Sequence, residues 1–290
     1  NDIMYIVGST SWQLQREELG KKQIREKLDD DIEGVILTES GSEFSDGNKF
    51  EIADIFSEDL CNSYYPHDEL KKFKEIHKGK RCFIIGNGPS LRIEDLNKID
   101  QNGDISFGMN RIFLLYDKTD WRPDYFVVDD FNAYRDNVAI YQKMDNDDMF
   151  VREFYSLAGY PNLRNAQRYH STFEDLRYKR PGFSDDISRN VYWGSTVAYS
   201  AMQIAAYMGF REIYLLGMDF NYEDRKVNRN IHFSEEYERT VRYEVNYKRE
   251  QSLAYQSAEL FSRNNGFRIY NATRGGALEI FERVDFDTLF

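Results

Sequence analysis

The sequence is poor in cysteine and has no long hydrophobic run. Its two cysteines, Cys61 and Cys82, are too few for a disulfide framework and form no C-x-x-C zinc pair. No stretch approaches the roughly 18 apolar residues of a membrane helix, and the first residues lack a signal-peptide pattern. We therefore expect no integral membrane segment. We expect a location in the reducing cytoplasm, with peripheral attachment to the inner membrane as a further option.

Basic residues are fewer than acidic ones: the chain has 38 Lys and Arg but 50 Asp and Glu, which gives a net charge of −12. Such a chain repels a polyphosphate backbone, so we expect no nucleic-acid partner, although a local pocket for one nucleotide stays compatible with this charge. No metal-ligand spacing links the four histidines, which are His67, His77, His170 and His232. Hydrophobic residues make up 41% of the chain, enough for a packed core.

Short apolar runs alternate with helical patterns from residue 68 onward. Expected strands cover 81–86, 104–110, 124–130, 149–154, 211–220 and, as the last one, 267–273; expected helices cover 68–78, 195–209 and 247–266. This alternation predicts an α/β fold with a Rossmann-like, doubly wound, mostly parallel sheet over residues 76–290.

Residues 1–75 show a different pattern. Strands are expected at 3–8 and 34–39 with a helix at 14–29 between them, whereas 40–62 is polar and is expected to be irregular. We interpret this part as a small α/β appendage or as the end of a preceding module.

Glycines and small polar residues follow the expected strands, where open α/β sheets bind ligands. Residues 86–90 can offer backbone N–H groups to a phosphate, with Ser90 capping the next helix, but they can equally be a plain turn. They match neither the dinucleotide fingerprint nor the P-loop. The other candidates can bind phosphate, sugar or base, or be simple caps, turns and surface charges. The full set is Gly86, Asn87, Gly88, Pro89, Ser90, Asn110, Arg111, Gly194, Ser195, Thr196 and Asn271.

Several acidic residues and one histidine are candidates for chemistry. Asp129 and Asp130 end an expected strand and can hold a metal or lie in a solvated loop. Asp219 ends another strand, where it can face a ligand or cap a turn, whereas 145–147 is expected to be an exposed loop. His232 can act as a general base or be a surface residue.

The ordered set FIIGNGPSL, FGMNR, WGSTVAYSAMQIAAYMGFREIYLLGMDF and NATRGG resembles two linked bacterial groups over residues 77–285. One group is the sialyltransferases that act on lipooligosaccharide. The other is a family similar to archaeal 6-hydroxymethylpterin pyrophosphokinases and to motility accessory factors that modify flagellin. The overall pattern is closer to the second group.

The resemblance to the sialyltransferases implies contacts with a CMP donor. It assigns Asn87, Gly88, Ser90, Asn110 and residues 194–196 to the nucleotide. It also implies a tyrosine at the donor phosphate, for which Tyr222 fits, with Tyr243 or Tyr247 as a second. The family's base is a histidine just before the last long helix. His232 lies earlier in the chain, so Asp219 and Glu235 stay as alternatives.

The implied function is an inverting glycosyltransferase that uses a CMP-activated, sialic-acid-like sugar and a glycan acceptor to build cell-surface glycans. It would need no metal and no cofactor besides the nucleotide-sugar donor. One alternative is a pyrophosphokinase that acts with ATP and Mg²⁺ on a hydroxymethylpterin-like substrate, with the metal on Asp129, Asp130 and Asp219. Another is a non-catalytic nucleotide-binding module. The acceptor and the oligomeric state are left open.

Overall fold

The computed structural model describes two parts of the chain, which form separate units. Contacts divide the chain into residues 1–65 with 156–160, and residues 66–155 with 161–290. In the first unit the structure describes the backbone of residues 35–38, 41–44 and 49–50. In the second unit it describes residues 67–144, 148–153, 161, 163–164, 166–172, 174, 176, 179–221, 232–233 and 248–290. The appendage expected for 1–75 and its boundary stay a prediction.

The described part of the first unit is a small antiparallel sheet. Its strands are β1 (Val35–Thr38), β2 (Gly41–Phe44) and β3 (Lys49–Phe50), paired in that order. β1 matches the strand expected at 34–39, but the expectation that 40–62 is irregular is wrong for β2 and β3. Only two residues separate β1 from β2, the length of a tight hairpin, so pairing does not need a hydrophobic pattern here. The strand expected at 3–8 and the helix at 14–29 lie outside the described residues.

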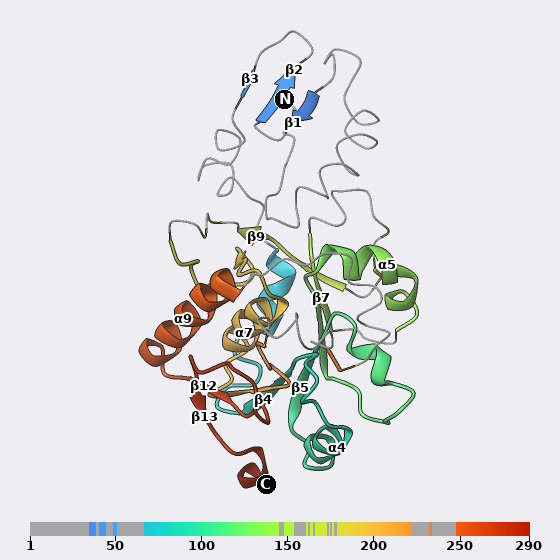
Figure 1. The fold of residues 1–290 in the computed structure, drawn as a ribbon, viewed down its shortest axis with the longest axis vertical. Helices are drawn as coiled ribbons and strands as arrows, with labels where there is room; N and C mark the ends of the chain where they lie inside the picture. The colour runs from blue at the N-terminus through green and yellow to red at the C-terminus, as the bar shows by residue number, and fades with distance from the viewer. Residues whose placement is uncertain are drawn as a thin grey trace. The chain divides into compact units, whose positions relative to one another are not determined.

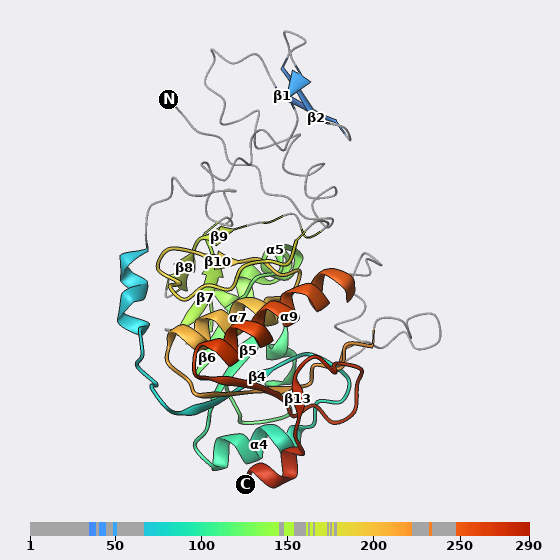
Figure 2. The same cartoon turned by 90° about the vertical axis from the view of Figure 1, so that its left-hand side faces the viewer.

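The second unit contains an eight-stranded sheet within its described residues (Figures 1 and 2). The strand order is β13-β12-β11-β4-β5-β6-β7-β8, and each neighbouring pair is parallel. The strands are β4 (Arg81–Ile85), β5 (Ile105–Met109), β6 (Tyr125–Val128), β7 (Met149–Arg152), β8 (Ala166–Tyr169), β11 (Glu212–Leu216), β12 (Arg268–Asn271) and β13 (Glu282–Arg283). The predicted α/β, doubly wound fold is confirmed.

The strand order reverses between β4 and β11. The chain runs outward from β4 to β8, returns to the other side of β4 and continues through β11 to β13. The register from Arg81 opposite Glu212 to Ile85 opposite Leu216 brings the ends of both strands level. Such a reversal is where open α/β sheets place their ligands, so the loops after β4 and β11 form the candidate ligand-binding edge.

Four α-helices and three 3-10 helices accompany the sheet in the described residues. They are α4 (Ile93–Gln101), α5 (Phe131–Tyr141), α7 (Val197–Tyr207), α9 (Lys248–Asn264), η1 (Asp68–Phe73), η2 (Ile112–Leu115) and η4 (Phe286–Leu289). α7 and α9 confirm two expected helices, and they pack side by side. The helix expected at 68–78 is wrong, because only η1 is helical. The amides of Glu75 and His77 donate instead to the carbonyls of Tyr207 and Met208 at the end of α7.

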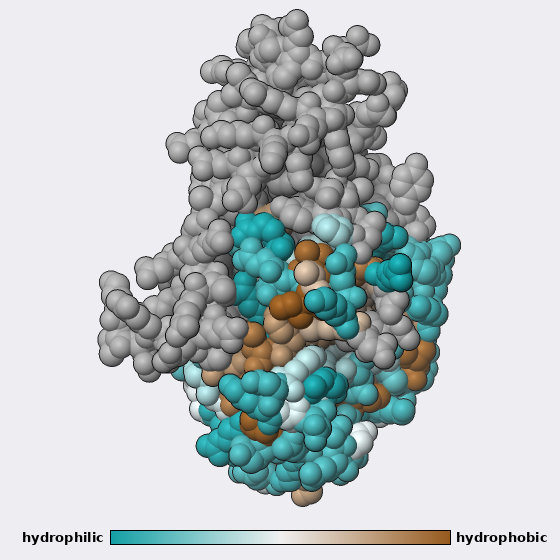
Figure 3. Space-filling view, turned by 90° about the vertical axis from the view of Figure 1, so that its right-hand side faces the viewer, coloured by the Kyte–Doolittle hydropathy of each residue, from teal (hydrophilic) through white to brown (hydrophobic). Residues whose placement is uncertain are grey.

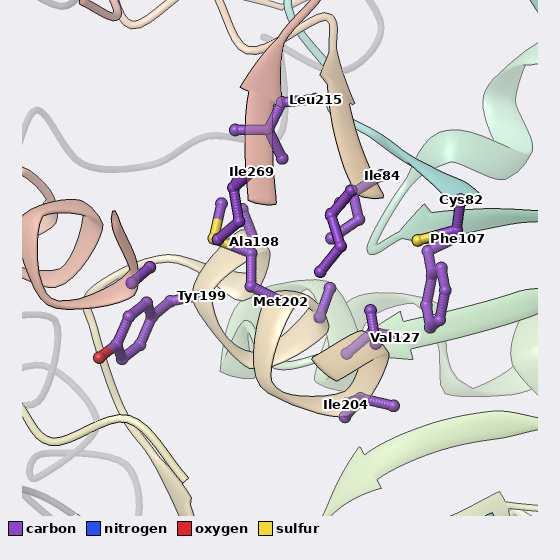
Figure 4. Packing of buried hydrophobic residues seen from close by; sticks show 14 of the residues in the cluster. Cys82, Ile84, Phe107, Val127, Ala198, Tyr199, Met202, Ile204, Leu215 and Ile269 are labelled. Atoms are coloured by element: carbon purple, nitrogen blue, oxygen red, sulfur yellow. The ribbon is translucent and has the colours of Figure 1, made fainter. Parts of the chain in front are cut away.

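Helix α7 covers one face of the sheet. Figure 4 shows Ala198, Met202 and Ile204 of α7 among residues of five strands, and all are buried; the strand residues are Cys82, Ile84, Phe107, Val127, Leu215 and Ile269. Successive strand residues point to opposite faces. Phe83 accordingly faces the other side, with ring centroids 5.3 Å from Tyr214 and 6.0 Å from Phe286. Burial on both faces explains the continuous apolar runs, and it raises the pKa of the Cys82 thiol.

A further parallel pair, β9 (Ser171–Thr172) and β10 (Val191–Tyr192), precedes α7. The described surface carries both hydrophilic and hydrophobic residues, and on one face a band of hydrophobic residues lies between hydrophilic ones (Figure 3). Within the described residues, no helix combines the length and the apolar character needed to cross a bilayer.

Candidate functional site

The loop that follows β4 packs directly against the loop that follows β11. The amide of Gly86 donates to the carbonyl of Leu216 at 2.7 Å, and the amide of Gly88 donates to that of Gly217 at 2.9 Å. A Cβ at Gly88 would overlap Oδ2 of Asp219 and lie 2.6 Å from the Gly217 oxygen. These glycines therefore allow two protein loops to meet. Because both amides already bind carbonyls, they are not free to bind a phosphate, which favours the plain-turn alternative for these two residues.

Asp219 joins three loops at this edge. Its Oδ2 accepts hydrogen bonds from the Ser90 hydroxyl at 2.7 Å and the Ser90 amide at 3.3 Å, and its carbonyl accepts one from the amide of Ala277 at 2.7 Å. Burial raises the pKa of Asp219 above its ordinary value, although the bonds from Ser90 oppose this. Ser90 was expected to cap α4, but the residue at that position is Arg92, which makes no side-chain cap bond. Ser90 instead connects its loop to Asp219.

One asparagine follows each of the neighbouring strands β4 and β5. Asn87 donates from Nδ2 to the Met109 carbonyl at 3.2 Å, and its Oδ1 is buried without a hydrogen-bond partner among the described residues. Asn110 is held at φ 46°, where its Oδ1 accepts from the Asp129 amide at 3.3 Å. A buried acceptor without a donor costs about 1–3 kcal/mol, so Oδ1 of Asn87 is an atom that a ligand can satisfy.

Pro89 and Arg111, the remaining candidates in these two loops, differ in their exposure to solvent. Pro89 is exposed at the turn. Arg111 is only 5% exposed, and its Nη2 lies 3.5 Å from Oδ2 of Asp136 in α5. The surface-charge alternative for Arg111 is therefore wrong, because the guanidinium is buried beside a carboxylate.

The carboxylates at the end of β6 already have protein partners. Asp129 is buried, accepts a short hydrogen bond from the Ser200 hydroxyl of α7 and lies 2.5 Å from Nε of Arg152. Burial raises its pKa, which Arg152 opposes. Asp130 caps α5 by accepting the Ala133 amide at 2.6 Å. The solvated-loop alternative is wrong for Asp129, because it is a buried ion pair. Residues 145–147 lie outside the described residues, so the loop expected there stays a prediction.

The segment before α7 holds this helix against α9. Thr196 is the N-cap, and its hydroxyl accepts from the Ala198 amide at 3.3 Å. A Cβ at Gly194 would lie 2.6 Å from the Cβ of Ala254, so the glycine permits the close approach of α9. Ser195 adopts φ 58°, and its buried hydroxyl has no hydrogen-bond partner among the described residues.

The remaining candidates are His232, Asn271 and Tyr222, and the structure describes the first two. The amide of Phe233 donates to the Asn87 carbonyl at 2.9 Å, which places His232 next to the loop after β4. Both polar atoms of the Asn271 side chain hold its own loop, because Nδ2 donates to Leu278 and Oδ1 accepts from Thr273. Tyr222 lies outside the described residues, as do Tyr243, Tyr247 and Glu235.

Strained backbone marks the same edge. Among the described residues, Asn110, Ser195 and Phe220 are three of the four non-glycine residues with positive φ, the fourth being Glu75. Such conformations cost about 1–3 kcal/mol each and gather at functional sites. The sequence gives no signal for them. It does signal Arg152, because a charge inside an apolar strand requires a buried partner.

The fold and this edge define an α/β protein of Rossmann-like type with a polar site at the reversal of strand order. Residues 60–225, more than half of the chain, match the family model described as 6-hydroxymethylpterin diphosphokinase MptE-like. The chain belongs to this family. The resemblance that the sequence motifs indicated is thereby confirmed. No curated protein matches the chain.

Solved structures with similar folds include two glycosyltransferases. The MAf glycosyltransferase from Magnetospirillum magneticum AMB-1 has 17% identity and a TM-score of 0.43, over 84% of this chain and 43% of its own. The sialyltransferase CstII from Campylobacter jejuni, in complex with a substrate analogue, cytidine-5'-monophosphate, has 15% identity and a TM-score of 0.41, over 71% of this chain and 85% of its own. The chain thus spans less than half the length of the first.

Proposed function

We propose that this protein is an inverting glycosyltransferase that uses a CMP-activated, sialic-acid-like sugar and a glycan acceptor. The observation that carries the proposal is the unpartnered Oδ1 of Asn87 at the reversal of strand order. Its Nδ2 is fixed by the Met109 carbonyl, so Oδ1 presents an acceptor for a base amine or a ribose hydroxyl. The motif resemblance assigns Asn87 and Asn110 to the CMP donor, which agrees with the hydrogen bond from Asn87 to the carbonyl of Met109, the residue before Asn110. A cytoplasmic location, with peripheral attachment to the inner membrane as an option, belongs to the proposal.

The chemistry requires a base and groups that stabilise the leaving phosphate. We assign the base to His232, whose backbone neighbour binds the Asn87 carbonyl. The imidazole takes the proton of the acceptor hydroxyl while that oxygen bonds to the anomeric carbon. The bond from that carbon to the phosphate oxygen breaks, and CMP leaves with the electron pair. The positive end of the α7 helix dipole and the predicted Tyr222 would stabilise the charge that develops on the phosphate.

Asp219 fits a positioning role better than that of a base. Its carboxylate is already engaged by two hydrogen bonds from Ser90, and its carbonyl holds the loop at Ala277. Through Ser90 and the glycine contact at Gly88, it fixes the turn that presents Asn87. We expect the reaction to need no metal, with the nucleotide-sugar donor as the only small molecule besides the acceptor.

The family match favours a second candidate, an ATP-dependent diphosphokinase acting on a hydroxymethylpterin-like substrate. That reaction needs carboxylates for Mg²⁺. Asp129 is paired with Arg152, Asp130 caps α5, and Asp219 binds Ser90. Because these three carboxylates have protein partners, the geometry supports the glycosyltransferase better.

Nucleotide-dependent stabilisation separates the two candidates. CMP at about 100 times its dissociation constant should stabilise the protein by about 2.7 kcal/mol without Mg²⁺, a rise in Tm of roughly 5–10 °C. Asn87→Ala should weaken CMP binding about tenfold, whereas Asn264→Ala, at an exposed asparagine of α9, should not. Stabilisation by ATP that occurs only when Mg²⁺ is present, with no effect of CMP, would support the diphosphokinase. A protein that responds to CMP but transfers no sugar would be a non-catalytic binding module.

A further inference from the structure

The starts of α7 and α9 meet at two residues with unsatisfied polar atoms. Gln251 of α9 is only 5% exposed, and its Nε2 donates to the Ser195 carbonyl at 3.0 Å. Its Oε1 is buried and has no hydrogen-bond partner among the described residues, and the same holds for the Ser195 hydroxyl. Because the carbonyl of Ser195 fixes the amide group of Gln251, Oε1 is held next to the α7 N-terminus as an acceptor.

Three unfavourable features coincide at these two residues. Each buried polar atom without a partner destabilises the folded chain, and native proteins contain few of them. Ser195 in addition adopts the left-handed backbone region at φ 58°, which disfavours a residue with a Cβ. Glycine would remove both the strain and the unpaired hydroxyl. Their combination on a single serine indicates that its side chain serves a ligand rather than the fold.

Contacts on both sides connect this pair to the candidate site. Tyr255 lies one helical turn after Gln251, and its ring packs at 5.7 Å from Phe220, the residue that follows Asp219. On the other side, Ser200 of α7 binds Asp129, whose amide in turn binds the Asn110 side chain. The pair therefore belongs to the carboxyl edge of the sheet that carries Asn87.

The unsatisfied atoms define the chemistry of the group they can bind. Oε1 of Gln251 only accepts, whereas the Ser195 hydroxyl both donates and accepts. A phosphate brings acceptors and would leave Oε1 unpaired at neutral pH. A hydroxyl group donates to Oε1 and accepts from Ser195, so it satisfies both atoms.

We propose that Gln251 and Ser195 form a subsite for a hydroxyl group of the transferred sugar, not for the nucleotide phosphate. The proposal rests on the glycosyltransferase function and adds Gln251 as a residue that determines sugar specificity. It also gives Ser195 a role different from the phosphate contact that a helix N-terminus suggests.

The test compares two ligands by calorimetry, CMP and CMP-N-acetylneuraminic acid. Ser195→Gly and Gln251→Ala should each weaken the binding of CMP-N-acetylneuraminic acid about five- to tenfold and leave CMP affinity within twofold. The matched control is Gln256→Ala, an exposed glutamine of the same helix, which should change neither affinity. Free Ser195→Gly should also melt about 2–4 °C above the wild type, because glycine relieves the left-handed backbone.

Different outcomes would overturn different statements. Equal weakening of both ligands, or of neither, would overturn the sugar subsite while leaving the glycosyltransferase proposal intact. A lower Tm of Ser195→Gly would show that the hydroxyl stabilises the fold, for example through a buried water, and would overturn the subsite without reference to any nucleotide. A wild-type protein that binds neither ligand would overturn the proposed function, and the sugar subsite with it.

Discussion

A methyl group added at Gly88 probes the contact that fixes the candidate site. The Cβ of alanine would overlap Oδ2 of Asp219 and lie 2.6 Å from the backbone oxygen of Gly217. The carboxylate can be removed by mutation, but the backbone oxygen cannot. Gly88→Ala and Asp219→Ala, alone and together, therefore separate the two contributions in a double-mutant cycle.

The structure sets the expected free energies of unfolding. Gly88→Ala should destabilise the protein by about 1–3 kcal/mol through overpacking, since Gly88 has no left-handed backbone for alanine to strain. Asp219→Ala removes the acceptor of the Ser90 hydroxyl and amide and should cost about 2 kcal/mol. The double variant lacks the overlap with the carboxylate, so it should be about 1–2 kcal/mol more stable than the sum of the single effects predicts.

Urea unfolding measures these values, provided that the m-value is the same for all four proteins. Gly103→Ala combined with Asp219→Ala is the matched control. Nothing lies within 4 Å of a Cβ at Gly103, so its cost of about 1 kcal/mol comes from its φ of +70° and should be additive. Additivity within about 0.3 kcal/mol for Gly88 and Asp219 would refute the contact between the two loops.

Two further predictions concern catalysis and pH. His232→Ala should lower turnover about 10²- to 10⁴-fold at saturating donor and acceptor while CMP affinity stays unchanged, and near wild-type turnover would return His232 to a surface role. Glu153 lies near two histidines, with its Oε2 3.5 Å from Nε2 of His67 and 3.7 Å from Nδ1 of His170. Burial favours neutral Glu153, but the two histidines outweigh it and lower the pKa of Glu153 from 4.5 to about 2. In the pH range where His67 is protonated, the ionised form of Glu153 therefore stabilises the protein above pH 4.5 by about 1–2 kcal/mol after solvent screening, and this is lost as the pH falls toward 2. Urea midpoints of wild type and Glu153→Gln should converge on acidification; a constant difference would contradict the ion pair.

The sequence predicts the central strands of the main sheet because they are buried on both faces. The runs around β4 and β11 are continuously apolar, and this pattern has no exposed alternative. β8 is missed because its sequence, AQRY, is mostly polar and partly exposed. The strand expected to be last, β12, is followed by β13, whose two residues are both exposed and leave no hydrophobic pattern.

The positions of the candidate site can be predicted better than the partners of its residues. Glycines and polar residues after strands mark the carboxyl edge, and there the Asn87 side chain binds the carbonyl of Met109, the residue before Asn110. The sequence cannot show that Ser90 binds Asp219, because 129 residues separate them and a serine before a helix looks like a cap. The sequence also does not indicate a role for Gln251, since an inward-facing glutamine of an amphipathic helix has no distinctive pattern.

The hydrogen bonds around Asp219 indicate that residues 60–225, which match the family model, depend on the residues that follow them. The family match ends at residue 225, yet the Asp219 carbonyl binds Ala277 and the Met218 amide donates to the Thr273 hydroxyl at 3.0 Å. Strand β11 also pairs along its length with β12. A chain shortened to the matched residues would expose this strand edge and release one side of Asp219. The C-terminal residues are thus a structural support for the segment by which the family is recognised.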